Sequence, residues 1–351
     1  MKKITGMNVL AICLIIIAAL VFVLYAWISH LQNTPQGKLD PRVALIVHFM
    51  GSPSADSYRT DLSAPENRRI IANKYEFLSH GFAKKVASVQ NIIIPDTAGD
   101  IPARVYTPKG TGPFPIIVFY HGGGWVLGTL DESDNLCKAL ANKTSAVVIS
   151  VDYRLAPEHV FPAAVDDAYT ALVYISKNAS RFDADASRIA VAGDSAGGNI
   201  AAVVSQMARD KKGPDIDCQI LIYPVTDLSR TDSYTYNKYQ KGFFLTRGDM
   251  QSFISLYTPN PKDRANPYAS PLCAQNFSSL PPALIITAEF DVLRAGGELY
   301  AKKLSDSGVA VKLSPYSGVF HGFVSVDSIL KQSDMAVDEI SALLKTTFAK
   351  K

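Results

Sequence analysis

The amino-acid sequence contains a serine in a setting that favours nucleophilic chemistry. Residues 193–197 read Gly-Asp-Ser-Ala-Gly. They follow the apolar run RIAVA, which is typical of a strand, and precede GNIAAVVSQMAR, whose apolar spacing is typical of a helix. Between a strand and a helix, the pattern G-x-S-x-G lifts the serine hydroxyl above a sheet, and its glycines permit the sharp turn. Ser195 is therefore a candidate nucleophile.

A glycine-rich loop is the second candidate for chemistry. Residues 121–124 read His-Gly-Gly-Gly and follow the strand-like run PIIVFY. Attack of a serine on an acyl carbonyl places negative charge on the carbonyl oxygen, and glycines let backbone N–H groups approach that oxygen without a Cβ in the way. This loop and the N–H of Ala196 together form a candidate oxyanion hole. We interpret His121 as orienting the loop by hydrogen bonding.

The order of residues along the chain indicates the general base. Folds that carry a serine on such a turn place the acid after the serine and the histidine last. The six histidines lie at positions 30, 48, 80, 121, 159 and 321. Only His321 follows Ser195, in the sequence GVFHGF, so His321 is the candidate base.

The acid is less constrained, because nine aspartates lie between Ser195 and His321. Asp291 stands just beyond the apolar run ALIIT, at the carboxyl end of an expected parallel strand, where open α/β sheets gather functional groups. Asp227 follows the run QILIY in the same manner, and Glu289 precedes Asp291 by two positions. Asp291 is the preferred acid, and the other two remain alternatives.

The elements that must position these residues alternate along the chain. Short apolar runs predict strands near residues 92–94, 103–106, 116–120, 146–151, 189–192, 219–223, 283–287 and 309–313. Helical spacing is found at residues 164–177, 198–209, 296–307 and 333–348. This alternation predicts an α/β fold with a mostly parallel central sheet covered by helices on both faces. Residues 229–280 are too many for a simple connection and should hold helices of their own.

The amino-terminal segment is long enough to cross a membrane. Residues 7–28 carry no charge, and 22 residues at 1.5 Å each span about 33 Å. Lys2 and Lys3 precede this run, which predicts a cytoplasmic amino terminus and an extracytoplasmic remainder. Residues 1–30 are thus expected to be a signal anchor, with a cleaved signal peptide and a buried helix as alternatives. The polar residues 31–40 are expected to be a linker.

Composition excludes several functional classes. The 351 residues are 48% hydrophobic and 19% charged, which excludes intrinsic disorder. The net charge is only +3, and two of those charges are Lys2 and Lys3, so no footprint for nucleic acid is visible. The four cysteines are widely spaced, without a CxxC pair, which argues against a structural zinc site or a disulfide framework.

Several ordered motifs together resemble a known family. HGGGW, DYRLAPEHVFPAA, GDSAGGN, LPPALIITAEFDVLR and FHGF are similar to the hormone-sensitive-lipase-like esterases of the α/β-hydrolase fold, over roughly residues 40–348. The resemblance implies an α/β-hydrolase domain at 41–348, with a helical cap from about 41–85 and part of 229–280. It departs at Asp291-Val292, where the family commonly has Asp-Pro. The anchor resembles the arylacetamide-deacetylase branch in architecture only.

The resemblance also implies roles for individual residues. Ser195 would be the nucleophile, Asp291 the acid and His321 the base, and the oxyanion hole would comprise Gly123, Gly124 and Ala196. We expect a membrane-anchored serine carboxylesterase for short to medium acyl esters, with no metal or organic cofactor. An amidase or deacetylase using the same triad is the main alternative, and a non-catalytic small-ligand receptor on this fold is a weaker one. The oligomeric state is left open.

Overall fold

A computed structural model describes residues 6–50, 62–79, 85–327 and 329–349. Its centre is an eight-stranded sheet in the order β10-β9-β8-β7-β5-β6-β4-β3. The six strands from β10 to β6 in this order are parallel, and β4 and β3 continue the sheet antiparallel. The strands are β3 (Ser88–Ile94), β4 (Ile101–Thr107), β5 (Phe114–Tyr120), β6 (Val147–Val151), β7 (Ala184–Asp194), β8 (Cys218–Ile222), β9 (Ala283–Phe290) and β10 (Val311–Phe320).

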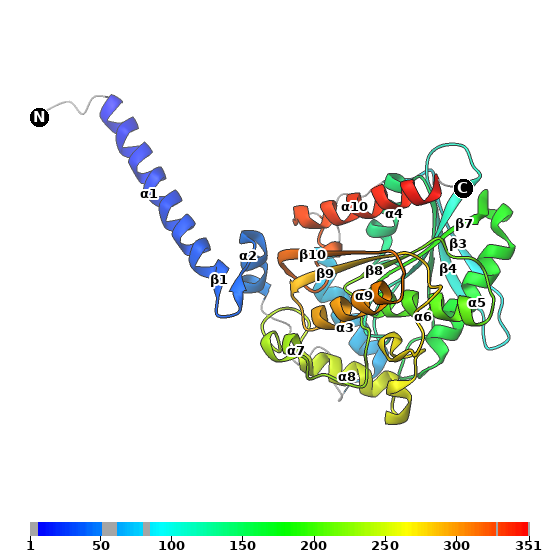
Figure 1. Cartoon of the computed structure of the whole chain (residues 1–351). Coiled ribbons are helices and arrows are strands. Elements are labelled where there is room, and N and C mark those ends of the chain that lie inside the picture. The colour runs from blue at the N-terminus through cyan, green and yellow to red at the C-terminus, as the bar shows by residue number, and fades with distance from the viewer. Residues whose placement is uncertain (1–5, 51–61, 80–84, 328, 350–351) are drawn as a thin grey trace, which may run out of the picture.

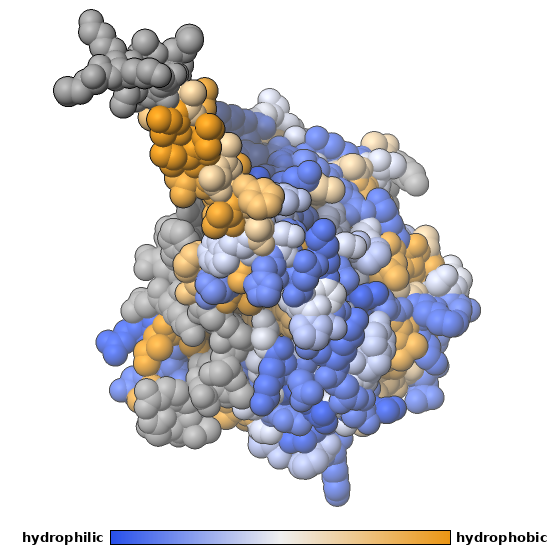
Figure 2. All heavy atoms as spheres, turned by 90° about the vertical axis from the view of Figure 1, so that its left-hand side faces the viewer, coloured by the Kyte–Doolittle hydropathy of each residue, from blue (hydrophilic) through white to orange (hydrophobic). Residues whose placement is uncertain are grey.

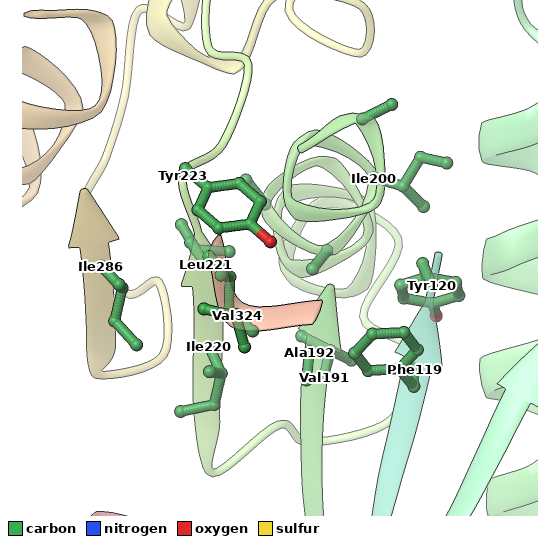
Figure 3. Close-up of a cluster of buried hydrophobic side chains, with 14 of the residues drawn as sticks. Phe119, Tyr120, Val191, Ala192, Ile200, Ile220, Leu221, Tyr223, Ile286 and Val324 are labelled. Atoms are coloured by element: carbon green, nitrogen blue, oxygen red, sulfur yellow. The ribbon is translucent and has the colours of Figure 1, made fainter. Parts of the chain in front are cut away.

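Helices cover both faces of this sheet, as Figure 1 shows. One face carries α4 (Asp134–Thr144) and α10 (Lys331–Phe348), and the other carries α5 (Ala163–Lys177), α6 (Ala196–Asp210) and α9 (Arg294–Asp306). The central strands β5, β6 and β8 are buried along their whole length, which explains their continuous apolar sequences. Figure 3 shows side chains of β5, β7 and β8 packed with Ile200 of α6. The predicted α/β architecture is confirmed.

The predicted elements agree with the observed ones in type and order, but several strands are longer than predicted and one helix was not predicted. All eight predicted strands are present, but β10 extends to Phe320 rather than ending at residue 313. Its second half contains Pro315 and Gly318, which weaken a strand signal yet are tolerated because β10 is an edge strand. Helix α4 was not predicted, although Leu136 and Leu140 stand at helical spacing and are buried.

The amino-terminal helix α1 (Gly6–Gln32) projects away from the domain (Figure 1). Residues predicted to be a linker contain a small hairpin, β1 (Asn33–Thr34) and β2 (Gly37–Lys38). The hairpin is fixed at its base, because the N–H of Leu39 donates to the carbonyl of Gln32 and the N–H of Asp40 donates to the carbonyl of Gly318. Helix α2 (Pro41–Met50) then packs against α1 and β10. The connection from α1 to the sheet is therefore short and hydrogen-bonded.

Two further groups of helices surround the carboxyl edge of the sheet. Helix α3 (Ala64–Ser79) is held by Arg68, whose guanidinium donates to both oxygens of Glu158 and to the carbonyl of Val126. The long segment after β8 contains α7 (Tyr234–Lys238), α8 (Arg247–Tyr257) and two short 3₁₀ helices, η2 (Pro261–Ala265) and η3 (Pro271–Cys273), as its length predicted. Glu158 thus fixes α3 to the loop that follows β6.

Candidate active site

Ser195 lies on a sharp turn between β7 and α6. Its backbone has φ 56° and ψ −117°, a conformation that costs of order 1–3 kcal/mol for a residue with a side chain. The turn is held by the N–H of Ser195 donating to the carbonyl of Ile222 at 2.8 Å. A Cβ at Gly197 would collide with the carbonyl oxygen of Tyr120, so only glycine fits there. The elbow predicted from the motif is present.

His321 and Asp291 meet Ser195 at the carboxyl edge of the sheet. His321 follows the last residue of β10, and Asp291 follows the last residue of β9. The His321 Nε2 lies 2.9 Å from the Ser195 Oγ, and its Nδ1 lies 2.7 Å from the Asp291 Oδ2. Because a carboxylate only accepts, Nδ1 carries the proton and Nε2 is left to accept from the hydroxyl. The structure therefore brings the three predicted residues into one hydrogen-bonded chain.

The two alternative acids, Asp227 and Glu289, accept hydrogen bonds from residues other than His321. One carboxylate oxygen of Asp227 accepts from the N–H and the hydroxyl of Ser229, and Glu289 accepts from the N–H of Gly318. Asp291 is completely buried, and its Oδ1 accepts from the N–H of Leu293 at 2.8 Å, which fixes the carboxylate in the orientation that meets His321. Geometry thus favours Asp291 over the other two candidates.

The glycine loop lies beside the serine and has a backbone that requires glycine. Gly123 and Gly124 have φ of 115° and 62°, and the carbonyl of Gly123 accepts from the N–H of Leu127. A Cβ at Gly124 would lie 2.5 Å from ring atoms of Phe253. In the described part of the chain, the N–H groups of Gly123 and Gly124 donate to no protein acceptor, and the N–H of Ala196 is in the unpaired first turn of α6. These three donors are available to an anion.

Asp194 joins the serine turn to the glycine loop, a role that the sequence interpretation missed. Its Oδ1 accepts from the N–H of Gly122 at 2.9 Å. Burial raises the pKa of Asp194 to about 6, although its bond to Gly122 and the nearby His321 oppose that shift. The sequence gives one signal for the bond between Asp194 and Gly122, which is the position of Asp194 directly before Ser195 in the motif.

His121 is a structural member of the same loop. Its ring stacks on Tyr153 with centroids 4.4 Å apart, and its Nδ1 lies 2.7 Å from the carbonyl of Gly122. The hydroxyl of Tyr153 donates to the carbonyl of His121. Burial lowers the pKa of His121, so its ring is neutral near pH 7. These contacts agree with the interpretation that His121 orients the loop.

A cavity of about 270 Å³ opens over Ser195 and His321. Most of its wall is apolar and comes from the insertion and the loops around it, including Leu127, Phe244, Leu245, Met250, Phe253 and Phe320. Ile71 of α3 also lines it. Phe243 packs against Phe290 and Trp125 stacks on Tyr257, both away from the cavity. In the described ranges, no group of three His, Cys, Asp or Glu side chains could hold a metal ion.

Comparison with known proteins places this site in a family. A family model described as alpha/beta hydrolase fold matches residues 117–325. Carboxylic ester hydrolase LipN of Mycobacterium tuberculosis is 45% identical over 263 residues, which cover 73% of this chain and 70% of LipN. An arylesterase of Saccharolobus solfataricus is 38% identical over 250 residues, which cover 71% of this chain and 80% of that enzyme.

Solved structures give the same result. An esterase of Pyrobaculum calidifontis superposes with a TM-score of 0.82 at 42% sequence identity, covering 88% of this chain and 98% of the esterase. The chain belongs to the alpha/beta hydrolase family and, within it, to the hormone-sensitive-lipase-like carboxylic ester hydrolases.

Proposed function

We propose that Ser195, His321 and Asp291 form the catalytic triad of this carboxylic ester hydrolase. The observation that carries the proposal is the chain of contacts at 2.9 Å and 2.7 Å at the base of an apolar cavity. His321 takes the Ser195 proton as Oγ attacks the ester carbonyl, and Asp291 holds the imidazole and stabilises the imidazolium. The protonated His321 then gives its proton to the leaving alcohol.

Water then hydrolyses the acyl-enzyme, and His321 again transfers the proton. His321 takes a proton from a water molecule that attacks the acyl-enzyme, and returns it to the Ser195 Oγ as the acid is released. In both steps, the charge on the substrate oxygen is stabilised by the N–H groups of Gly123, Gly124 and Ala196. The rigid loop geometry described above supports this assignment, because preorganised donors stabilise charge without reorganising.

Substitution of Gly124 tests the oxyanion assignment. We expect Gly124→Ala to lower kcat by about 10²- to 10³-fold, because the new Cβ would meet the Phe253 ring and the left-handed backbone would shift its N–H. Gly99→Ala is the matched control, since Gly99 also has a positive φ but faces open space. Steady-state kinetics on one soluble ester measure both variants. Equal kcat losses in the two variants would contradict the assignment.

The substrate is proposed to be an ester with a short to medium acyl chain. The cavity of about 270 Å³ is smaller than the roughly 300–1,000 Å³ of sites for drug-sized ligands, and Phe244 and Phe253 close part of its wall. We expect p-nitrophenyl butyrate and hexanoate to react faster than long-chain esters and faster than matched anilides. Rates across such a panel test this. Faster hydrolysis of emulsified long-chain triacylglycerol, or of the anilides, would reverse it.

The amino-terminal helix is proposed to anchor the enzyme in a membrane, with the catalytic domain on the extracytoplasmic side. Within Ala11–Gln32, the most apolar stretch of 18 residues has a mean hydropathy of 2.9, and none of that stretch is buried within the protein. Figure 2 shows this apolar helix standing above a largely polar surface. An exposed apolar surface of this size indicates contact with lipid or another apolar phase. Lys2 and Lys3 support a cytoplasmic amino terminus.

Aromatic side chains at the base of α1 support the same proposal. The ring of Trp27 lies 5.4 Å from that of His48 and 6.0 Å from that of Phe49, in edge-on arrangements. Phe49 is 73% exposed. Amphipathic aromatic groups concentrate at membrane–water interfaces. This cluster stands where the span would leave the membrane.

Removal of the anchor tests the membrane proposal. We expect deletion of residues 1–30 to give a soluble, active enzyme, because the hairpin and the buried Leu39 remain. The full-length protein should stay with membranes through washes in high salt and alkaline carbonate. Release of the full-length protein by high salt alone would contradict an anchor. Sequencing of the mature amino terminus distinguishes an uncleaved anchor from a cleaved signal peptide.

A further inference from the structure

One acidic side chain in the wall of the active-site cavity has no role in the mechanism above. Glu132 lies in the loop between Gly128 and α4 and lines the cavity together with Ser195 and His321. Its side chain is exposed to that space. Within the described residues, its carboxylate accepts no hydrogen bond and pairs with no cation. The described wall of the cavity contains neither lysine nor arginine.

Unlike Glu132, the carboxylates around it have hydrogen-bond or ion-pair partners within the protein. Asp131 lies 2.7 Å from Arg104, and Asp134 forms an ion pair with Lys138. In the cavity itself, Asp194 accepts from Gly122, and Asp249 accepts from the N–H and hydroxyl of Thr246 in a helix cap. The acidic neighbours are thus neutralised or engaged by the protein, whereas Glu132 faces the space that a substrate fills.

We propose that Glu132 determines specificity by favouring esters that carry an ammonium group and disfavouring esters that carry a carboxylate. The proposal rests on hydrolysis at Ser195 in the same cavity. An ammonium group would supply the cation that the described residues do not place beside Glu132. A carboxylate in the same position would meet a like charge and be repelled by it.

The charge state of Glu132 makes this selection depend on pH. Desolvation raises the pKa of Glu132 to about 7, and the negative charges of Asp194 and Asp131 contribute to the shift. Glu132 is therefore mostly neutral at pH 6 and mostly charged at pH 8, so the preference for the cationic ester should grow as the pH rises. The other titratable groups around the cavity are His121, His321, Asp194 and Asp249, and Asp327 faces Glu132 in a small adjoining cavity.

Two series of matched esters test the proposal from either side of the scissile bond. The acyl series is ethyl 6-aminohexanoate, ethyl hexanoate and monoethyl adipate. The alcohol series joins butyrate to choline, to 3,3-dimethylbutanol and to 4-hydroxybutanoate. For each enzyme, kcat/KM of the charged esters is divided by that of the neutral ester. The full chain is used as wild type, as Glu132→Gln, as Glu132→Lys, and as Asp131→Asn, which removes a neighbouring charge of the same sign.

In at least one series, the wild-type ratio of cationic to anionic ester should exceed unity and should fall by about 10- to 100-fold in Glu132→Gln, through KM rather than kcat. Glu132→Lys should invert the ratio, and Asp131→Asn should leave it near the wild-type value. The ratio should rise between pH 6 and 8 in the wild type and be flatter in Glu132→Gln. Unchanged ratios in both Glu132 variants would overturn the inference. Failure of the wild type to hydrolyse the neutral esters would instead refute the proposed function.

Discussion

Replacement of Ser195 by alanine should lower kcat for ester hydrolysis by about 10⁴- to 10⁶-fold. The Oγ of Ser195 is the atom that His321 contacts at 2.9 Å, and its loss leaves only binding and the oxyanion hole to act on the ester. The fold should survive, because alanine removes one hydroxyl from a turn that backbone hydrogen bonds also hold. Single-turnover and steady-state rates on p-nitrophenyl butyrate, beside circular dichroism, measure both effects.

The matched control is Ser205→Ala. Ser205 lies on the same helix, α6, and its hydroxyl only donates to the carbonyl of Ala201. We expect this variant to stay within a few-fold of the wild type. An active Ser195→Ala enzyme, or an equal loss in Ser205→Ala, would show that the serine elbow is not the catalytic centre.

Replacement of Asp291 by asparagine should lower kcat by about 10⁴-fold with little change in fold. The N–H of Leu293 donates to Oδ1, so the amide oxygen would stay there and the amide nitrogen would donate to His321 Nδ1. The imidazole would then no longer be held in the tautomer that accepts the Ser195 proton. The imidazolium would also lose its buried counter-charge. Steady-state kinetics on the same ester compare kcat of Asp291→Asn with that of the wild type, and thermal unfolding compares their stability.

Asp227→Asn is the control for Asp291→Asn. Asp227 also follows a parallel strand, but its carboxylate accepts from Ser229 instead of meeting the histidine. Its replacement should therefore cost far less activity. The assignment of the acid fails if the two losses come out in the opposite order.

The sequence predicted the serine, the base and the sheet because each depends on local patterns. The strand-turn-helix pattern around Ser195 and the apolar strand sequences require no knowledge of distant contacts. The order of residues along the chain then left His321 as the single candidate base. The acid was ambiguous for the opposite reason, since an aspartate follows each of two parallel strands and only their spatial arrangement distinguishes Asp291 from Asp227.

Features that depend on packing between distant segments were missed. The bond from Gly122 to Asp194 joins residues 72 positions apart, and no local pattern encodes it. Phe49 lies on the same helix as the buried Val43 and Ile46, but six residues along a helix rotate its side chain about 120° away from that of Val43. That rotation takes Phe49 off the buried face and towards Trp27. No local pattern distinguishes Glu132, which pairs with no cation among the described residues, from Asp131 and Asp134, which do.

The most direct test of the account is covalent labelling of the full-length enzyme with a fluorophosphonate ester. Such reagents trap a serine that an adjacent base activates, so the labelled residue identifies the nucleophile without any substitution. Peptide mass spectrometry should find one adduct per chain, on Ser195, with loss of activity in proportion to labelling. Labelling should fail in the His321→Ala variant. An adduct on another serine, or complete inactivation with Ser195 unmodified, would contradict the account.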